Sequence, residues 1–572
     1  MLIALLIANT FARAQNPIAN NNATMSALGE TLYIHANTTT VVTGETLYCK
    51  LYCLNPSNNT PSTISKIAYI ELIEKTQKSV LKQKLYLDNG KAQGDFFIPT
   101  TLKTGNYKLI AYTKWMLNYN TSAYFEMDIT IINPFQPLDP ENIAKNDSVS
   151  EEVSLINPEI KNEGIFSILT DKKNYSFREK VNLKIQSLEG TMQKGSYSVS
   201  VRKTDALSHQ KQANAKEFVK SKESVSPAKT IFLPELRGEL LSGSIISKKG
   251  KELNHKSVAI SIAGSSFALK IAETDRLGKF TFILDKNPNL SNLVIQVLEE
   301  DRDDFSIILD ESNTVDLSRL SFLAEFLLSP KLKNAIEERS VANQIENAYY
   351  AKKKDSITTF SGSDSFFHPL EKVYVLDDYT RFPTMKETIT EIVLEMYYKK
   401  DKNKYAIFLR NYAVPNMEVY GAPLLLIDGL LIQDANELFD YNIENINKIS
   451  LINEPYVYGP KTFGGVINIT TKNQDYETRA KGDFIKNITI PRPVNQKNYY
   501  QPDYAAGNFN SRIPDYRQQL LWLPETKLDN LENTISFYTS DIAGKFEITV
   551  EGFTDTGIPV SIKDSFEVNN AQ

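Results

Sequence analysis

Residues 422–432, APLLLIDGLLI, carry the strongest fold signal in the chain. Leu424–Ile427 is a short continuous apolar run, which is typical of a strand buried on both faces. Asp428-Gly429 is a strong signal for a two-residue hairpin turn, because that turn needs a positive φ at both positions. Leu430–Ile432 is then the returning strand. The sequence therefore predicts a buried hairpin that turns at Asp428 and Gly429.

Two further motifs follow this hairpin. Residues 443–452, IENINKISLI, begin with a helical apolar spacing and then run into a strand. Residues 458–472, YGPKTFGGVINITTK, contain the pair Gly464-Gly465, which permits close approach of neighbouring backbone. An alternating strand follows the two glycines.

In this order and spacing, the three motifs resemble the plug domain of TonB-dependent outer-membrane receptors. The match covers roughly residues 384–473, and we place the plug-like α/β domain at residues 370–475. The resemblance implies contact with an outer-membrane β-barrel protein. The residues that we single out as possible partner contacts are Asp428, Gly429, Tyr458, Gly459, Gly464 and Gly465.

Receptors of this family continue from the plug into a barrel of about 22 strands, each of roughly 10 residues. Only 100 residues follow Lys472 in this chain. We therefore expect a plug-like domain without its own pore, and no transport by this chain alone.

Residues 28–135 alternate strand-like runs with turn signals such as Asp88-Asn-Gly90, which predicts a β-sandwich. Within them, Tyr69–Met116 (YIELIEKTQKSVLKQKLYLDNGKAQGDFFIPTTLKTGNYKLIAYTKWM) resembles a macroglobulin-type domain of exported Bacteroidetes proteins. Phe166–Ser187 resembles the same type of domain, and we expect a second such sandwich with an exposed loop over residues 160–230.

Ile535–Gly557 resembles the closing macroglobulin-type sandwich of the same barrel-less proteins. This resemblance predicts a separate C-terminal sandwich over residues 480–572.

Residues 231–312 resemble the carboxypeptidase regulatory-like module, a small seven-stranded sandwich without peptidase chemistry. The stretch that carries this resemblance is AETDRLGKFTFIL, Ala272–Leu284. There Asp275 and Gly278 are expected to form a tight turn, and Phe280 and Phe282 to face the core. Residues 315–360 show a helical apolar spacing, with a break at Pro330, and are expected to be a helical segment.

Residues 1–14 are expected to be a secretory signal peptide, because the apolar run Leu2–Ala8 precedes the small-x-small site Ala12-Arg-Ala14. A buried N-terminal strand is the alternative. Cys49 and Cys53 lie on the same face of an alternating strand, about 13 Å apart. A disulfide needs Cα atoms less than about 7 Å apart, so two buried reduced thiols are expected.

Composition excludes several classes of function. The 572 residues carry 64 Lys and Arg against 69 Asp and Glu, a net charge of −5, which argues against nucleic acid as the main partner. The four histidines are scattered and the cysteines number two, so a Cys-His zinc site lacks its ligands. No run approaches the roughly 20 apolar residues of a membrane helix, so the chain is not expected to span a membrane itself.

Carboxylates offer the remaining candidates for chemistry. Asp377-Asp378 are sequence neighbours that point to opposite faces if extended, and Asp428 fits a turn better than acid-base catalysis. Asp434 completes this set of acidic candidates. Asp301, Asp303 and Asp304 are expected to be a solvated acidic loop, with a cation site as the alternative. We therefore expect no catalytic residue, no metal site and no small-molecule cofactor.

These expectations describe a multidomain, mainly β protein, with macroglobulin- or immunoglobulin-like sandwiches, an α/β plug-like domain and a short helical segment. The favoured function is that of a non-enzymatic exported protein, periplasmic or associated with the outer membrane. It would associate with an outer-membrane barrel partner as a transport or secretion accessory. A surface structural or carbohydrate-binding protein is the alternative, and an enzyme with an unrecognised site is a third possibility.

Overall fold

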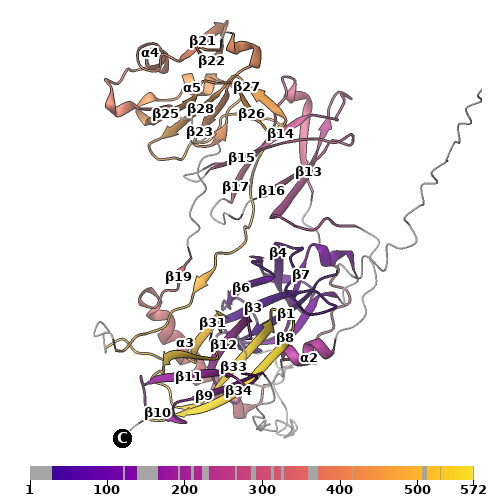
Figure 1. The fold of residues 1–572 in the computed structure, drawn as a ribbon, viewed down its shortest axis with the longest axis vertical. Coiled ribbons are helices and arrows are strands. Elements are labelled where there is room, and N and C mark those ends of the chain that lie inside the picture. The colour runs from indigo at the N-terminus through magenta and orange to yellow at the C-terminus, as the bar shows by residue number, and fades with distance from the viewer. Residues whose placement is uncertain are drawn as a thin grey trace, which may run out of the picture. The chain divides into compact units, whose positions relative to one another are not determined.

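The computed structural model is mainly β and contains several sheets in two compact units (Figure 1). Unit 1 comprises residues 1–236, 316–356 and 498–572, and unit 2 comprises residues 237–315 and 357–497. The structure describes residues 29–119, 123–137, 165–190, 193–207, 212–221, 231–263, 267–284, 286, 291–310, 315–323, 328–358, 372–414, 416–505, 512–528 and 530–570. The predicted signal peptide, residues 1–14, lies outside these ranges.

The first sandwich of unit 1 is built as predicted from strands within residues 28–135. One sheet has the order β1 (Thr31–Ala36), β3 (Thr46–Leu54), β6 (Lys91–Phe97). The other has the order β2 (Thr40–Val42), β8 (Phe125–Ile132), β7 (Gly105–Thr113), β4 (Ile67–Glu74), β5 (Ser79–Tyr86). The predicted turn is present between β5 and β6, where Asn89 and Gly90 have φ of 48° and 72° and Asp88 pairs with Lys91.

The two cysteines lie on β3 and are buried free thiols, as predicted. Their spacing of four residues along one strand keeps the sulfur atoms apart. Burial raises the pKa of both thiols, so they are held in the neutral form.

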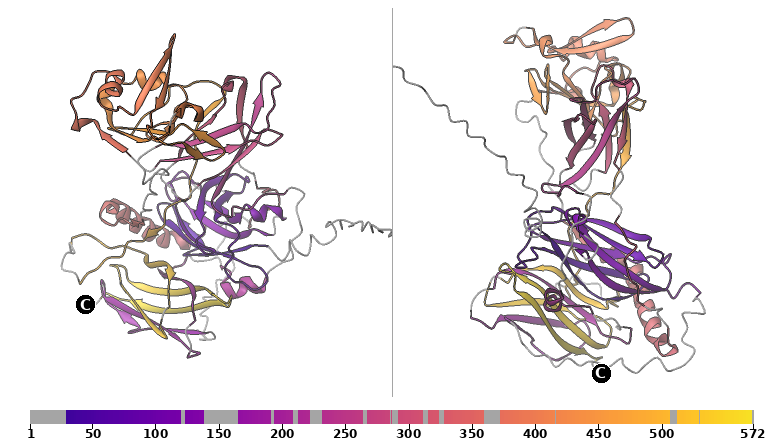
Figure 2. Two further views of the ribbon diagram at one scale, coloured as in Figure 1. Left: turned by 45° about the horizontal axis from the view of Figure 1, so that its top comes forward. Right: turned by 90° about the vertical axis from the view of Figure 1, so that its right-hand side faces the viewer.

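The second sandwich joins strands that lie more than 300 residues apart in sequence. Its larger sheet has the order β10 (Asn174–Tyr175), β34 (Pro559–Val568), β33 (Gly544–Thr554), β12 (Gly195–Lys203), β31 (Gln519–Thr526). Its smaller sheet has the order β32 (Glu532–Tyr538), β11 (Lys180–Ser187), β9 (Phe166–Thr170). Figure 2 shows the yellow C-terminal strands interleaved with the magenta strands.

This arrangement corrects the prediction of one sandwich over residues 160–230 and another over residues 480–572. β12 lies between β31 and β33, and β11 pairs with β32, so neither segment has a complete sheet alone. A single hydrophobic core of side chains from both segments fills the space between the two sheets. Along the sequence, all of unit 2 therefore lies between two strands, β12 and β31, of a single sandwich of unit 1.

The two sandwiches repeat one local device. The Tyr107 hydroxyl donates to the Lys103 carbonyl (2.9 Å), and the Tyr197 hydroxyl donates to the Gln193 carbonyl (2.8 Å). In both cases a tyrosine two residues after a glycine closes the start of a strand onto the backbone four residues earlier, in the manner of a tyrosine corner. This repeat supports the observation that both domains are sandwiches of one type.

The predicted helical segment, residues 315–360, is only partly helical. Helix α3 spans Lys333–Ala348, whereas residues 315–323 form no helix despite their apolar spacing. α3 lies along the first sandwich (Figure 2), because buried Arg339 reaches Glu45 and the amide of Asn347 donates to the Gly44 carbonyl. The helix is held by this buried charge pair and by Ala335 and Ile336, which pack against a small apolar cluster that includes Val42.

The first part of unit 2 is a two-sheet sandwich. Its sheets have the orders β16 (Lys279–Leu284), β13 (Glu239–Ser247), β18 (Phe305–Leu309) and β15 (Ala268–Glu273), β14 (Ser257–Ile262), β17 (Asn292–Val297), β29 (Ile485–Thr489). The predicted turn forms, with Gly278 at a φ of 76° and Phe280 and Phe282 in the core. The predicted module, residues 231–312, lacks one of its strands. β29 comes from beyond the mixed sheet in sequence and pairs with β17.

The second part of unit 2 holds the three motifs of the plug-like resemblance in one sheet, with the order β20 (Lys372–Val375), β25 (Ile446–Ile452), β28 (Val466–Thr471), β23 (Leu424–Ile427), β24 (Leu430–Leu431). β23 and β28 are parallel and the other pairs are antiparallel, so the sheet is mixed. One face packs on helices α4 (Met385–Glu391) and α5 (Asn436–Phe439), as expected for this segment.

Two hairpins extend from this sheet, β21 (Met396–Asp401) with β22 (Lys404–Leu409), and β26 (Tyr456–Tyr458) with β27 (Lys461–Phe463). The remaining short elements are α2 (Ala215–Lys220), β19 (Ser356–Ile357), β30 (Lys497–Asn498) and the 3-10 turns η2 (Trp115–Asn118), η5 (Arg302–Asp304), η6 (Pro330–Leu332), η7 (Tyr350–Lys352), η8 (Leu376–Asp378), η9 (Met417–Tyr420) and η10 (Ile443–Asn445). None of the helices in the described residues has the length and apolar character needed to cross a bilayer.

Candidate functional site

The predicted hairpin between β23 and β24 is present, and its turn residue has a second role. Asp428 and Gly429 have φ of 50° and 80°, as the two-residue turn requires. The Asp428 carboxylate is buried and accepts hydrogen bonds from the Thr471 amide (2.7 Å), the Thr471 hydroxyl (2.6 Å) and the Tyr476 amide (3.2 Å). Asp428 therefore ties the hairpin to the end of β28, and its oxygens are used within the domain.

The double glycine lies where three loops converge. A Cβ atom on Gly464 would lie 2.4 Å from the Gly421 carbonyl oxygen, and one on Gly465 would lie 2.4 Å from the Ile452 carbonyl oxygen. Gly465 also has a φ of 103°, which side chains rarely tolerate. The predicted close backbone approach is thus present, and it brings together the loops that follow β22, η9 and β25.

Three of the six predicted partner contacts touch the sandwich of unit 2. The Tyr458 hydroxyl donates to the Leu269 carbonyl. A Cβ on Gly459 would lie 3.1 Å from the Ile271 carbonyl oxygen, and one on Gly429 would lie 2.1 Å from the Cβ of Phe267. These residues are therefore occupied by the chain itself, which sequence reasoning did not foresee.

A network of hydrogen bonds extends this contact along β14 and β17. The side-chain amide of Gln296 donates to the Leu431 carbonyl (2.8 Å), and the Leu431 amide donates to the Ser261 hydroxyl (3.1 Å). The Gln433 amide donates to the Gln296 side-chain oxygen (2.7 Å). Around these bonds, the outer face of the mixed sheet and the face of the sandwich share one apolar cluster. The sandwich therefore covers the edge strand β24, so a partner cannot pair with this strand.

Several large apolar side chains in the segments that meet near this junction are exposed to solvent. Tyr412 is 97% exposed, Val419 is 81% exposed and Val457 is 70% exposed. Leu394 and Tyr420 are also exposed. Sequence reasoning did not single out these positions, because none of them carries a motif; Val419 and Tyr420 lie in η9 and Val457 lies in β26. The one signal in the sequence was the double glycine, which fixes where the loops meet.

The acidic candidates are engaged in structural pairs. Asp377 is paired with Arg381, whose hydrogen bond lowers the pKa of the Asp377 carboxyl. Asp301 and Asp304 both accept from Lys251, and these hydrogen bonds lower the pKa of both carboxyls. The Asp434 carboxylate accepts from the Asn436 amide (3.0 Å), which caps a turn. Among the described residues, no group of three or more His, Cys, Asp or Glu side chains is placed to hold a metal ion.

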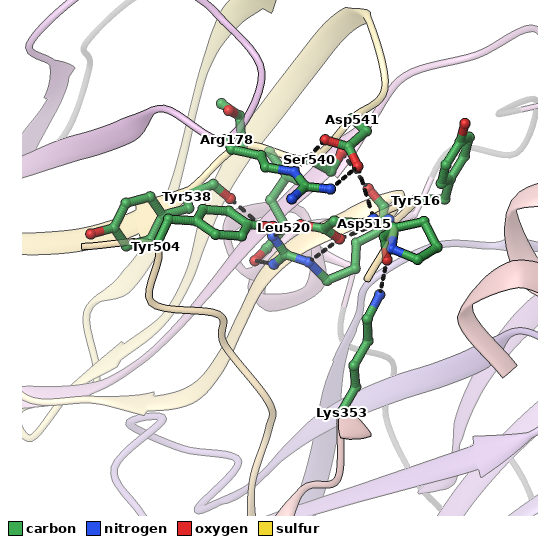
Figure 3. A network of polar contacts seen from close by, with 12 residues as sticks. Arg178, Lys353, Tyr504, Asp515, Tyr516, Leu520, Tyr538, Ser540 and Asp541 are labelled. Carbon is green, nitrogen blue, oxygen red and sulfur yellow. Dashed lines mark hydrogen bonds and ion pairs between the residues drawn. The ribbon is translucent and has the colours of Figure 1, made fainter. Parts of the chain in front are cut away.

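The densest polar network of unit 1 lies where the chain re-enters the second sandwich (Figure 3). Arg517 donates to both oxygens of Asp515 (2.7 Å each), and Arg178 donates to both oxygens of Asp541 (2.6 Å each). Burial alone would raise the pKa of Asp515, but the Arg517 guanidinium outweighs it and holds that pKa below its ordinary value. The charged side chains of this network are paired, Lys353 with Glu346 among them, so the network anchors the returning segment.

A second buried group lies between the two sandwiches of unit 1. The Glu551 carboxyl accepts from the Ser561 hydroxyl (2.6 Å), the Ala215 amide (2.9 Å) and the Tyr33 hydroxyl (3.1 Å). Burial raises the pKa of Glu551 to about 7. His35, which contacts Ser198 on the same interface (2.7 Å), has its pKa lowered by burial to about 3. Glu551 and His35 therefore connect the two sandwiches, and the pKa of each differs from its ordinary value in the folded chain.

Comparisons with known proteins give a limited picture. No family model matches the sequence, and no curated protein matches it. Among solved structures, Escherichia coli alpha-2-macroglobulin activated by porcine elastase is similar at 9% identity and a TM-score of 0.25, over 95% of this chain and 44% of that chain. Salmonella alpha-2-macroglobulin reacted with methylamine is similar at 9% identity and a TM-score of 0.23, over 95% and 39%. The Yersinia pseudotuberculosis adhesin InvE is similar at 13% identity and a TM-score of 0.13, over 49% and 57%.

The chain thus spans less than half the length of the macroglobulin chains. Likenesses this weak carry no argument about the fold or the activity of this chain.

Proposed function

We propose that this chain is a non-enzymatic exported protein that associates with an outer-membrane β-barrel protein through its plug-like domain, as an accessory of transport or secretion. The plug-like domain comprises residues 372–475. The sandwiches would hold this domain in place and would not contact the barrel protein themselves. The observation that carries the proposal is the mixed sheet whose strands are joined through the Asp428-Gly429 hairpin and preceded by the Gly464-Gly465 pair.

The geometry of the motif residues supports a binding role over a chemical one. The Asp428 carboxylate accepts hydrogen bonds from Thr471 and Tyr476. Gly464 and Gly465 allow neighbouring backbone segments to approach closely. Catalysis needs a nucleophile or base within reach of a reacting group, together with a stabiliser of the charge that develops. The motif residues supply a rigid scaffold with loops at one end, which is how binding surfaces are commonly built.

The contact of the plug-like domain with the neighbouring sandwich also supports this role. The shared apolar cluster and the Gln296–Leu431 hydrogen bond fix the domain on the rest of unit 2. A binding domain held rigidly loses less freedom when it associates, and so retains more of its contact energy as affinity.

The test is affinity purification of the tagged full-length chain from detergent-solubilised membranes of its native host. We expect an outer-membrane barrel protein to be enriched. The matched control is Gly465→Leu, which disrupts the loop junction while leaving the sandwiches of unit 1, whose integrity is followed by limited proteolysis. Loss of the barrel protein with this variant supports the proposal. Equal recovery with both chains, or glycan binding by the soluble chain without any membrane partner, would refute it and favour a surface structural or carbohydrate-binding role.

A further inference from the structure

Residues 212–221 carry helix α2, which lies against both sandwiches of unit 1. The helix packs on β1 of the first sandwich and on β33 and β34 of the second. The side-chain amide of Gln212 donates to the Ile34 carbonyl (2.9 Å), and the Tyr33 hydroxyl lies 3.4 Å from the Ala213 carbonyl oxygen. Residues 212–218 are defined here as the clasp, because they contact both domains.

An aromatic contact seats the clasp on the first sandwich. The Phe218 ring lies 5.2 Å from the Tyr33 ring and 6.4 Å from the Phe125 ring, measured between ring centroids. Asn214 and Glu217 close the start of α2 with a capping box. A helix of six residues is not stable alone in water, so docking is what keeps the clasp ordered.

A buried carboxyl attaches the clasp to the second sandwich. The Ala215 amide donates to Oε2 of Glu551 (2.9 Å), and the two residues are 0% and 2% exposed. The same oxygen lies 3.1 Å from the Tyr33 hydroxyl, and Oε1 lies 2.6 Å from the Ser561 hydroxyl. The Glu551 carboxyl therefore joins β1, β34 and the clasp at one point.

The direct partners of this carboxyl are uncharged. Within the part of the chain that the structure describes, no lysine, arginine or histidine forms an ion pair with Glu551. A protonated carboxyl satisfies all three contacts, since its hydroxyl can donate to Ser561 while the other oxygen accepts from Ala215 and Tyr33. An ionised carboxyl would be a buried charge without a counter-ion, which is unfavourable unless water reaches it.

Three titratable side chains beside Glu551 keep one charge state while it titrates. Burial raises the pKa of Tyr33 and of Tyr52. Burial lowers the pKa of His35 to about 3. All three side chains therefore stay neutral between pH 4.5 and pH 7 and do not compensate a charge on Glu551.

The charged side chains around Glu551 do not compensate it either. Lys563 acts on Glu551 from β34, but its ammonium is paired with Glu547 (2.7 Å). The clasp itself brings the Glu217 carboxylate, a like charge, close to Tyr33. Ionisation of Glu551 is therefore opposed as long as the clasp shields it from water.

We propose that residues 212–218 are a pH-released clasp: Glu551 holds them across the two sandwiches while its carboxyl carries a proton, and its ionisation frees them. Release of the clasp exposes Tyr33 and Phe125, against which Phe218 packs. The Lys50–Glu525 ion pair joins the sandwiches without the clasp, so the two domains stay together when it opens.

The direction of the pH dependence follows from the two states. With the clasp docked, burial raises the pKa of Glu551 to about 7, whereas a carboxyl open to water has its ordinary pKa of 4.5. The proton thus stabilises the docked state. Opening is rarest below pH 4.5, increases as pH rises to about 7 and is constant above that. The two pKa values allow an increase of up to about 300-fold.

The test is hydrogen–deuterium exchange of the full-length chain between pH 5 and pH 8, with rates corrected for intrinsic exchange. Peptides from residues 212–221 report the clasp, and peptides from β33 report global unfolding. We expect the opening equilibrium of residues 212–221 to rise about tenfold or more over this range, beyond any change in β33. Opening that does not change with pH overturns the inference.

Glu551→Gln identifies the group that titrates. Its amide keeps an oxygen that accepts from Ala215 and a donor for Ser561, so it imitates the neutral carboxyl. We expect rare opening at every pH. Glu532→Gln is the matched control, because it makes the same change on β32, where Glu532 is paired with Lys184 at the surface, and it should behave like the wild type. An equal pH response in Glu551→Gln and the wild type, or its loss in Glu532→Gln, overturns the inference.

Phe218→Ala tests the docking contact without changing Glu551. We expect opening of residues 212–221 to increase about tenfold or more at pH 5, with the rise toward pH 8 retained. Unchanged opening at pH 5 would show that the measured event is not undocking of the clasp, and would overturn the inference even if Glu551→Gln did not fold.

Discussion

The hydroxyl of Tyr458, in the plug-like motif, donates a hydrogen bond to the carbonyl oxygen of Leu269, in the neighbouring sandwich. The two residues lie 189 positions apart, yet the bond joins the β26–β27 hairpin to β15. Together with the Gln296–Leu431 bond and a shared apolar cluster, this bond packs the mixed sheet against the sandwich within unit 2. Part of the receptor-like motif thus serves internal assembly.

The contribution of this bond can be measured with Tyr458→Phe, which keeps the ring and removes the donor. We expect a loss of about 0.5–1.5 kcal/mol in the stability of unit 2, because the Leu269 carbonyl loses its hydroxyl donor. Faster amide exchange in β15 should accompany this loss. Tyr412→Phe is the matched control, since its hydroxyl is in solvent and its removal should change neither quantity. Identical exchange in β15 for both variants would contradict the assignment.

Gly465→Ala tests the loop junction. Its Cβ would lie 2.4 Å from the Ile452 carbonyl oxygen, at a φ of 103°. We expect a loss of about 2–4 kcal/mol from overpacking and backbone strain together. Gly421→Ala separates the two causes, because it has a φ of 84° with nothing within 4 Å of its Cβ, and it should lose only about 1 kcal/mol. Equal losses by chemical denaturation would show that the junction is not crowded.

Arg339→Met tests the buried pair that holds α3. Removing the guanidinium leaves the Glu45 carboxylate buried with Arg202 as its remaining charged partner. We expect a loss of about 3–5 kcal/mol, and the double variant Arg339→Met, Glu45→Met should recover only part of it, because buried Arg202 then keeps Asp205 as its acidic partner. Lys333→Met, on the exposed side of the same helix, should change stability by less than about 0.5 kcal/mol. No recovery in the double variant would contradict this account.

The interface between the sandwiches of unit 1 predicts a pH dependence in which two groups oppose each other. The pKa of Glu551 is raised to about 7, so the folded state keeps a proton that the unfolded chain releases above its ordinary pKa of 4.5. Its contribution to stability is present at low pH and is lost as pH rises from about 4.5 to about 7. The pKa of His35 is lowered to about 3, so its contribution grows as pH rises from about 3 to 6.5.

Between pH 4.5 and 6.5 these two slopes cancel in the wild type. Glu551→Gln should remove one of them, so that stability relative to the wild type rises by about 3 kcal/mol as pH increases across this window. His35→Asn should give the opposite trend. Urea unfolding at several pH values measures both variants. Parallel pH profiles for the wild type and Glu551→Gln would show that this carboxyl does not titrate with folding.

Local turn chemistry explains which parts of the fold the sequence predicts. Asp428-Gly429, Asn89-Gly90 and the double glycine require special backbone angles or close approach, and each is found where it was predicted. The strand runs of the first sandwich are likewise predictable, because their periodicity is local.

Long-range pairing explains what could not be predicted. β12 pairs with β31 and β33, which are more than 300 residues away, and nothing in a strand's own residues names its partner. The apolar spacing of residues 315–323 suggested a helix that the structure does not contain. The exposure of Tyr412 and Val419 depends on how the chain folds around them, so it is visible only in the structure.

Hydrogen–deuterium exchange of the full-length chain, with and without outer-membrane vesicles of its native host, tests the central claim most directly. Docking through the plug-like domain predicts protection within residues 372–475, with unit 1 unchanged. Protection confined to the sandwiches of unit 1, or no protection anywhere in the chain, would contradict the account.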